Sequence, residues 1–166
     1  MTDNTEKVDL QGALKGLELI PYGVYIVTTG GGVLESGAFT ACWMMQISFE
    51  PLLVALAVDR VGHSHMLLEE NGNFAVNFLH QSQTQIAARM ATPHTYSPFK
   101  MNAFSWGEGL TGVPILKDSL GHIECIINDQ TTIAGDHTLF IGQVIDGNQV
   151  RRDTVLTLEK SGLRYK

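Results

Sequence analysis

The stretch GAFTACWMMQISFEPLLVAL, residues 37–56, begins and ends like a β-strand, but its middle has the periodicity of neither a strand nor a helix. The residues that interrupt the two apolar runs are polar or aromatic: Thr40, Cys42, Trp43, Gln46 and Ser48. A plain connection would need only a few turn residues. Backbone N–H and C=O groups in an irregular segment are not all used by a strand ladder, so they can bind a ligand. The stretch therefore predicts two strands joined by a segment that holds a ligand.

The length and composition of the chain predict one globular domain that spans residues 1–166. Apolar residues make up 44% of the chain and charged residues 17%, which is typical of a folded protein rather than a disordered one. The formal net charge of −6 argues against a nucleic-acid partner, because such a protein needs a basic surface to neutralise phosphates.

Targeting signals and cysteine spacing predict a cytoplasmic protein with no membrane partner. The N-terminal sequence MTDNTEKVDLQ is polar and acidic, unlike a signal or transit peptide. The longest apolar run, LLVALAV, is far shorter than the roughly 20 residues that span a bilayer. Cys42 and Cys125 lie far apart and form no CxxC pair, so we expect reduced thiols and no metal site.

Short β-branched and aromatic runs recur along the chain, and each predicts a strand. Residues 23–29 and 33–39 flank the glycines Gly30 to Gly32 and predict a hairpin. The run at 52–58 is apolar on both faces, which predicts a buried central strand. Further strands are predicted at residues 73–79, 122–129, 138–146 and 154–159.

Three short helices are expected beside these strands. Leu10, Leu14 and Leu17 have helical spacing, residues 63–71 predict a helix that stops at Gly72, and Ser82 with Gln85 forms a capping box for a helix over 82–90. Many strands joined by hairpins, with a few short peripheral helices, are typical of a mainly β protein. We therefore expect a closed or nearly closed antiparallel barrel.

Five segments carry a resemblance to a known family: GVYIVTT, GAFTACWMMQISFEPLLVALAV, NGNFAVNFL, GVPILKDSLGHIECII and GDHTLFIGQV. Their order, from about Leu17 to Val144, resembles that of the flavin reductase-like proteins of the FMN-binding split-barrel superfamily. The pattern of Trp43, Gln46, Ser48-Phe49 and Pro51 is most similar to the flavin reductase domains that accompany flavodiiron and rubredoxin systems. The resemblance implies an antiparallel, Greek-key split β-barrel, a homodimer with FMN near its subunit interface, and NADH or NADPH as the electron donor.

The resemblance also implies roles for the interrupted stretch. Phe39, Thr40, Ala41, Cys42 and Trp43 would line the isoalloxazine ring, and Gln46 and Ser48 would bond the ribityl chain or the ring edge. From the residues alone, Trp43, Met44 and Met45 are better explained as ordinary core. The resemblance favours flavin contact for residues 40–43 and leaves the two methionines as packing. Many relatives carry Ser or Ala at the Cys42 position, which favours a small filler there over a redox thiol.

The phosphate of FMN would need hydrogen-bond donors and positive potential in an acidic protein. Arg60, Ser64 and His65 lie at the start of the helix predicted at 63–71, where free N–H groups and the helix dipole favour an anion. The resemblance implies that Ser64 contacts the phosphate. The alternative is a plain helix cap with a solvated arginine beside it.

The sequence AGDHTLFIGQV contains a second candidate site, because Gly135, Asp136 and His137 resemble a motif on the nicotinamide side of the family's pocket. Asp136 can orient His137, and together they are the predicted catalytic pair. Their expected role is to position the rings while the cofactor carries the hydride, so no general base is expected. The alternative is that His137 is a structural histidine.

The long loop over residues 91–114 is the last candidate feature, because loops of that length usually serve a function. His94, Tyr96, Phe99 and Lys100 could cover the flavin, grip the dinucleotide, or only anchor a surface loop. We expect residues 91–106 to help close the flavin site of the second subunit.

Two functions follow from the resemblance. The first is an NAD(P)H:flavin oxidoreductase that passes electrons to free flavin, oxygen, ferric complexes or a redox protein partner. The second is an FMN-holding electron carrier that a protein partner reduces in place of a nicotinamide dinucleotide. The Gly-Asp-His sequence and the long loop favour the enzyme.

Overall fold

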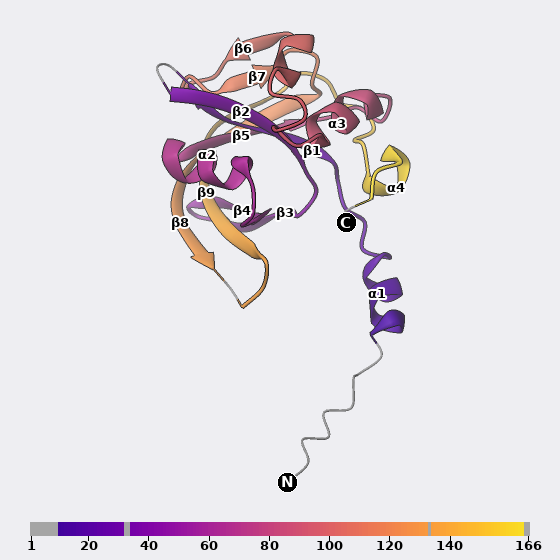
Figure 1. The fold of residues 1–166 in the computed structure, drawn as a ribbon. Coiled ribbons are helices and arrows are strands. Elements are labelled where there is room, and N and C mark those ends of the chain that lie inside the picture. Colours follow the sequence, from indigo (N-terminus) through magenta and orange to yellow (C-terminus); the bar gives the residue numbers. More distant parts are fainter. Residues whose placement is uncertain (1–9, 32–33, 133, 165–166) are drawn as a thin grey trace.

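A computed structural model describes residues 10–31, 34–132 and 134–164 of the chain. Within these ranges nine strands alternate with short helices (Figure 1). The strands are β1 (Tyr25–Gly31), β2 (Leu34–Ala41), β3 (Met44–Phe49), β4 (Leu52–Asp59), β5 (Asn73–Phe78), β6 (Trp106–Glu108), β7 (Pro114–Leu116), β8 (Gly121–Thr132) and β9 (His137–Gln149). The helices are α1 (Gln11–Leu17), α2 (His63–Asn71), α3 (Thr84–Ala91), the 3-10 turn η1 (Lys100–Ala103) and α4 (Leu158–Ser161).

Seven of these strands form one antiparallel sheet in the order β2-β1-β5-β8-β9-β4-β3. The strands β2 and β3 are therefore opposite edges, yet only Cys42 and Trp43 separate them in sequence. Such a short connection is possible only if the sheet rolls up until its two edges meet. The result is a barrel that stays open between β2 and β3, which confirms the predicted antiparallel split barrel.

Irregularities in the longest strands let the sheet curl. The β8–β9 ladder shifts register between Glu124 and Cys125 and again between Ile127 and Asp129. An extra residue in one strand bends that strand and increases its local twist. In Figure 1, β8 and β9 curve from the layer that contains β2, β1 and β5 to the layer that contains β4 and β3.

The barrel interior holds the main apolar core. Val27, Leu56, Phe74 and Phe140 come from four different strands and are all fully buried. Gly142 faces Phe74, and a Cβ atom at that position would come within 2.6 Å of two carbons of the phenyl ring. The glycine therefore makes room for the largest side chain of the core.

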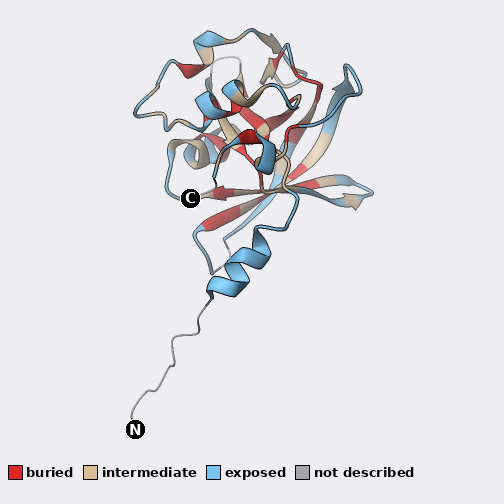
Figure 2. Cartoon of the chain, turned by 90° about the vertical axis from the view of Figure 1, so that its right-hand side faces the viewer, coloured by how far each residue is buried: buried red, intermediate tan, exposed pale blue. Residues whose placement is uncertain are grey.

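The helices lie at the periphery, as expected, but they differ in burial. Every residue of α1 is exposed, although Leu14 and Leu17 do share its helical spacing (Figure 2). The helix α2 ends at Gly72, whose φ of 65° is the left-handed conformation that a glycine adopts readily. The predicted capping box at α3 is wrong, because the N-cap is Gln83 and the Ser82 hydroxyl instead lies 2.7 Å from His80 Nδ1.

Three further segments differ from the prediction. Residues 44–49, expected to belong to an irregular connection, form the strand β3, which pairs with β4, so the irregular part is limited to Cys42 and Trp43. Residues 154–159 form isolated bridges, Val155 with His80 and Thr157 with Gly23, and then enter α4 in place of a full strand. The region predicted as a loop over 91–114 contains η1 and the strand β6, which pairs with β7. Within the described part of the chain, no helix is long and apolar enough to cross a membrane.

Candidate functional site

A cavity of about 500 Å³ lies beside β2, the edge strand at which the barrel is open. Its walls come from β2, from the end of β4, from the start of α2 and from the segment that follows α3. Four of the predicted site residues line it: Phe39, Thr40, Ala41 and Ser64. The structure therefore brings part of the interrupted stretch next to the helix start that was predicted to bind phosphate.

The wall formed by β2 can offer backbone groups to a ligand. The strand pairs with β1 along one edge, and no described strand pairs with its other edge. The hydroxyl of Thr40 donates to the carbonyl oxygen of Ala87 at 2.6 Å, so this side chain fastens α3 to β2. The hydroxyl hydrogen of Thr40 is thus already used, so towards a ligand this hydroxyl could only accept a hydrogen bond.

Cys42 and Trp43 connect β2 to β3, and both pack against other parts of the protein. Cys42 is 4% exposed, and burial raises the pKa of its thiol to about 11, which keeps it protonated at neutral pH. The indole of Trp43 lies 4.7 Å from the His137 ring and 6.4 Å from the Tyr22 ring, measured between ring centroids. Trp43 therefore joins the interrupted stretch to the Gly-Asp-His sequence.

The Gly-Asp-His sequence lies where β9 begins, as the sequence predicts. Nδ1 of His137 lies 2.5 Å from Oδ1 of Asp136, and the histidine is only 6% exposed. His137 pairs in the sheet with Asp59, and Asp59 lines the cavity. The structure thus places this motif next to the cavity wall, with its imidazole held against Trp43.

Arg60 stabilises the turn that carries this motif. Its guanidinium donates to the carbonyl oxygen of Gly135, and its backbone N–H donates to the carbonyl oxygen of Asp136 at 3.0 Å. Arg60 is exposed and is not among the residues that line the cavity. A role in phosphate binding remains a prediction for this residue.

Three more predicted residues lie outside the cavity lining. Gln46 and Ser48 flank a bulge in β3, and the Gln46 side-chain amide donates to the Ser48 carbonyl oxygen at 3.2 Å. His65 Nε2 lies 2.8 Å from the Thr138 hydroxyl, and its ring meets Phe140 edge-on. Their flavin contacts stay predictions.

The start of α2 provides the positive end of the site. Gly62, His63 and Ser64 all line the cavity, and the N-cap residue is Gly62, which has no side chain that could cap the first N–H groups of the helix. The first N–H groups of a helix lack intrahelical partners and carry partial positive charge. This end of the cavity therefore fits a phosphate group.

Lys100 is a cavity residue whose environment the sequence could not predict. It is 6% exposed, and its Nζ donates to the carbonyl oxygens of Met90 and Thr92 at 2.7 Å each. Burial lowers the pKa of its ammonium group from 10.5 to about 8. Lys100 thereby ties the segment after α3 to the last turn of that helix, and its only sequence signal is a lysine inside an aromatic loop.

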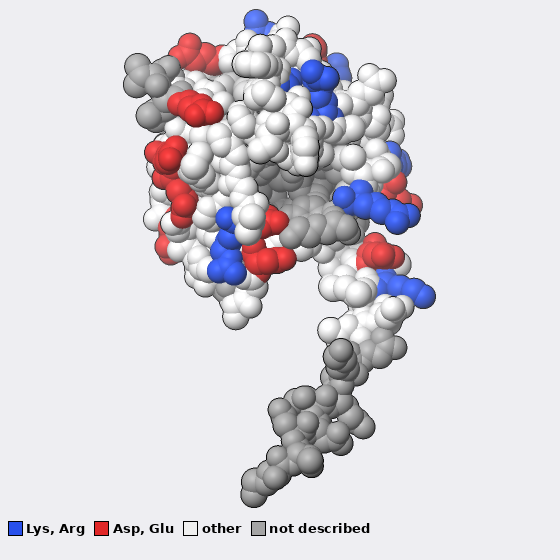
Figure 3. Space-filling model, viewed as in Figure 1, with Lys and Arg blue, Asp and Glu red and all other residues white. Residues whose placement is uncertain are grey.

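On the face seen in Figure 3, Asp and Glu side chains gather along the left edge, while Lys and Arg side chains lie mainly at the top and on the right. No continuous basic surface is visible on that face. Among the described residues that line the cavity, Lys100 is the one lysine or arginine, and its ammonium group already donates to two carbonyl oxygens. The helix start is therefore the feature that attracts an anion.

Comparisons with known proteins give the family. Residues 17–165 match the model of the "Flavin reductase like domain" family. The chain is 34% identical over 128 residues to an NADH-dependent FAD reductase of Streptomyces globisporus, covering 75% of this chain and 68% of that protein. It is 32% identical over 149 residues to a flavin reductase (NADH) of Kitasatospora aureofaciens, covering 89% and 73%.

A solved structure supports the same family assignment. BorF, the flavin reductase component of a bacterial two-component tryptophan halogenase, superimposes with a TM-score of 0.79 at 28% identity, over 92% of this chain and 96% of that one. The resemblance inferred from the sequence is thus confirmed over nearly the whole chain. The chain belongs to the flavin reductase-like family.

Proposed function

We propose that this protein binds FMN in the cavity beside β2 and reduces it with NADH or NADPH. Family membership makes the chain an NAD(P)H:flavin oxidoreductase; the choice of FMN and the residues that hold it are the proposal. The observation that carries it is the cavity of about 500 Å³, which places the open edge of β2 opposite the start of α2.

The β2 wall suits the flat ring of a flavin. Phe39 and Ala41 line the cavity while also packing against the barrel core, and the unpaired strand edge offers N–H and C=O groups for the polar ring edge. Thr40 and Cys42 would complete this wall, with the Cys42 thiol protonated and acting as a filler.

The start of α2 suits a single phosphate. His63 and Ser64, whose N–H groups belong to the first turn of the helix, line the cavity, and the helix dipole adds attraction for a dianion. This supports FMN, whose one phosphate needs one such site, whereas FAD would place a second phosphate and an adenosine beyond it.

His137 and Trp43 would form the side on which nicotinamide docks. Bound flavin supplies the hydride acceptor of the reaction. The protein's part is to hold the donor ring in line and to exclude water. The rigid contacts of His137, to Asp136 on one side and to Trp43 on the other, fit that positioning role.

Flavin titration and anaerobic reduction test the proposal together. We expect one FMN per chain, weaker binding of FAD and of riboflavin, and rapid bleaching of the flavin absorbance near neutral pH on addition of NADH or NADPH. A protein that binds FAD more tightly than FMN would refute the cofactor choice. An FMN complex that nicotinamides reduce no faster than free FMN would leave only the electron-carrier function.

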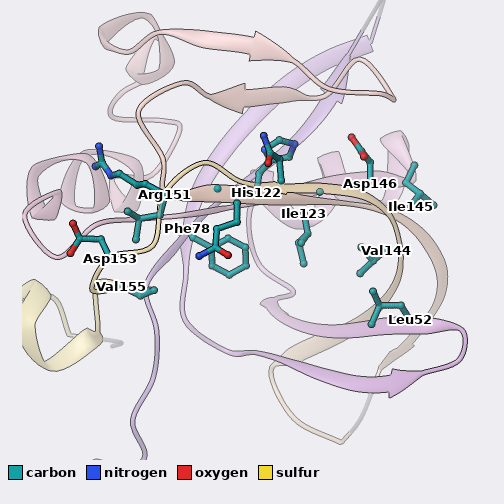
Figure 4. A pocket seen from close by; sticks show the side chains of 15 residues that line it. Leu52, Phe78, His122, Ile123, Val144, Ile145, Asp146, Arg151, Asp153 and Val155 are labelled. Atoms are coloured by element: carbon teal, nitrogen blue, oxygen red, sulfur yellow. The ribbon is translucent and has the colours of Figure 1, made fainter.

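We also propose that the protein is a homodimer. Met45 and Phe49 of β3 are 63% and 88% exposed. A second cavity, of about 660 Å³, shares no lining residue with the first, and Figure 4 shows Phe78, Ile123 and Val144 along it. Exposed apolar surface on an edge strand and an apolar groove both favour burial against another subunit.

Sedimentation of a matched pair of variants tests the dimer. Phe49→Asp should yield a monomer, whereas Leu110→Asp changes a 71% exposed leucine elsewhere and should remain dimeric. A monomeric wild-type protein that retains FMN would rule the dimer out. In the dimer, residues 91–106 would approach the second flavin site, although part of this segment, between Ala91 and Met101, also lines the cavity of its own chain.

The reduced flavin would pass its electrons to free flavin, oxygen, a ferric complex or a protein partner such as a flavin-dependent oxygenase. The name of BorF describes a reductase that serves a partner enzyme, which supports the last of these. A single domain over residues 1–166 and a cytoplasmic location complete the proposal.

A further inference from the structure

Three side chains from separate parts of the chain meet at the cavity: Glu35 of β2, His63 at the first position of α2, and His94 in the segment after α3. Nε2 of His63 lies 3.3 Å from Oε1 of Glu35, and the two imidazole rings stack with centroids 4.0 Å apart and planes inclined by 29°. One ligand atom from each residue lies within 4.8 Å of the others. We propose that these three residues bind a divalent transition-metal ion such as Zn²⁺.

The donor atoms of the cluster favour a metal over a simple ion pair. The two imidazoles stack with their centroids 4.0 Å apart, and Glu35 adds the one carboxylate of the cluster. A neutral imidazole offers a nitrogen lone pair in the plane of its ring. A cation at the edges of the two rings and beside the carboxylate would therefore meet a donor atom from each of the three residues.

A second cluster with the same residue types provides the contrast. His122, Glu124 and Asp146 also lie within ligand distance of one another. Glu124 is fully buried and already accepts hydrogen bonds from the backbone N–H groups of Leu110 and Thr111 and from the Thr111 hydroxyl. Its carboxylate is committed to the β6–β7 turn, so this second cluster is a poor metal site.

The three residues fit zinc in the chemistry of their donor atoms and in the distances between those atoms. Two imidazoles and one carboxylate form a known type of zinc site that leaves one position open. Donor atoms around tetrahedral zinc lie about 3.3 Å apart, given zinc–nitrogen distances near 2.0–2.1 Å. The His63–Glu35 pair is already at that separation, and the 62% exposed Glu35 side chain is free to adjust.

Metal at this site would connect the walls of the cavity. Glu35 and His63 belong to the framework of β2 and α2, whereas His94 lies in the segment that Lys100 anchors to α3. An ion bound by all three residues would hold the segment around His94 against β2 and α2. Bound metal should therefore restrict opening of the segment, and so slow exchange of any molecule in the cavity.

Zinc titration of the full-length protein, stripped with a chelator and free of flavin, tests the site directly. Competition with a chromophoric zinc chelator should give one bound Zn²⁺ per chain. His94→Ala and Glu35→Gln should each weaken binding by about tenfold to a hundredfold or more, at least the loss seen when a residue that only supports a ligand is removed. The matched control His122→Ala should bind as the wild type does.

Two outcomes would overturn the inference: absence of zinc binding by the wild type, or equal zinc affinity in the wild type, His94→Ala and Glu35→Gln. Glu35→Gln guards against a folding defect, because this exposed side chain changes little in size. Hydrogen exchange gives a second readout, with zinc expected to protect amides of residues 91–101 in the wild type and not in His94→Ala. Neither measurement includes flavin or nicotinamide, so they stand apart from the reductase activity.

Discussion

Replacing His137 by alanine tests whether the Gly-Asp-His sequence positions nicotinamide. The imidazole lies against Trp43 at 4.7 Å and its Nδ1 lies 2.5 Å from the Asp136 carboxylate. The variant removes both contacts but leaves the β9 backbone, which pairs with β4 through Asp59. We expect the barrel and the FMN site to persist while reduction by NAD(P)H slows.

The size of each effect follows from these contacts. Loss of one hydrogen bond costs about 1 kcal/mol, and loss of one aromatic contact about 0.5–1.5 kcal/mol. Together they come to about 2 kcal/mol, well below the roughly 5–15 kcal/mol by which typical domains are stable. A misplaced donor ring should lower the reduction rate by about one to two decades, which corresponds to about 1.4–2.7 kcal/mol in the barrier.

Stopped-flow reduction of the FMN complex measures the effect. Dithionite needs no docked nicotinamide, so its rate should be unchanged in the variant. His80→Ala is the matched control, because His80 lies 3.4 Å from Asp153 in a comparable pair outside the cavity lining. If His137→Ala and His80→Ala are reduced by NADH at the same rate as wild type, the positioning role of His137 is refuted.

Three further predictions concern other residues of the site. Trp43→Ala should weaken FMN binding or shift the bound flavin spectrum more than it lowers the melting temperature; an unchanged affinity and spectrum would make Trp43 a core residue. Burial raises the thiol pKa of Cys42 to about 11 and of Cys125 to about 12, so neither should react with a thiol reagent at pH 8 until the protein unfolds, and rapid labelling would contradict this. The pKa of Lys100 falls from 10.5 to about 8, so between these pH values the unfolded chain binds more protons and this residue makes unfolding less favourable as pH rises. Lys100→Met should lack that part of the pH dependence in denaturant titrations, and an identical slope in both proteins would disprove it.

Local patterns were enough to predict most of the strands. The β-branched runs around Gly30, the apolar run of β4 and the glycine at position 72 each express a preference of the nearby backbone, and the structure confirms them. Where the prediction was wrong, a competing contact determined the structure, a local one at Ser82 and tertiary ones at residues 154–159. Ser82 turned to His80, so it did not cap α3, and residues 154–159 bridged to His80 and Gly23 and built no full strand.

By itself the sequence determined the fold class, because alternation and turn glycines are properties of neighbouring residues, and the order of its motifs resembled the family that the comparisons confirm. Tertiary structure alone decided that β2 and β3 are opposite edges of one sheet, and that the cavity lies at this opening. It also decided that Glu35, His63 and His94 meet, and that two carbonyl oxygens hold the Lys100 ammonium. These are contacts between residues far apart in the chain, which depend on how the sheet curls, and no local pattern encodes that curvature.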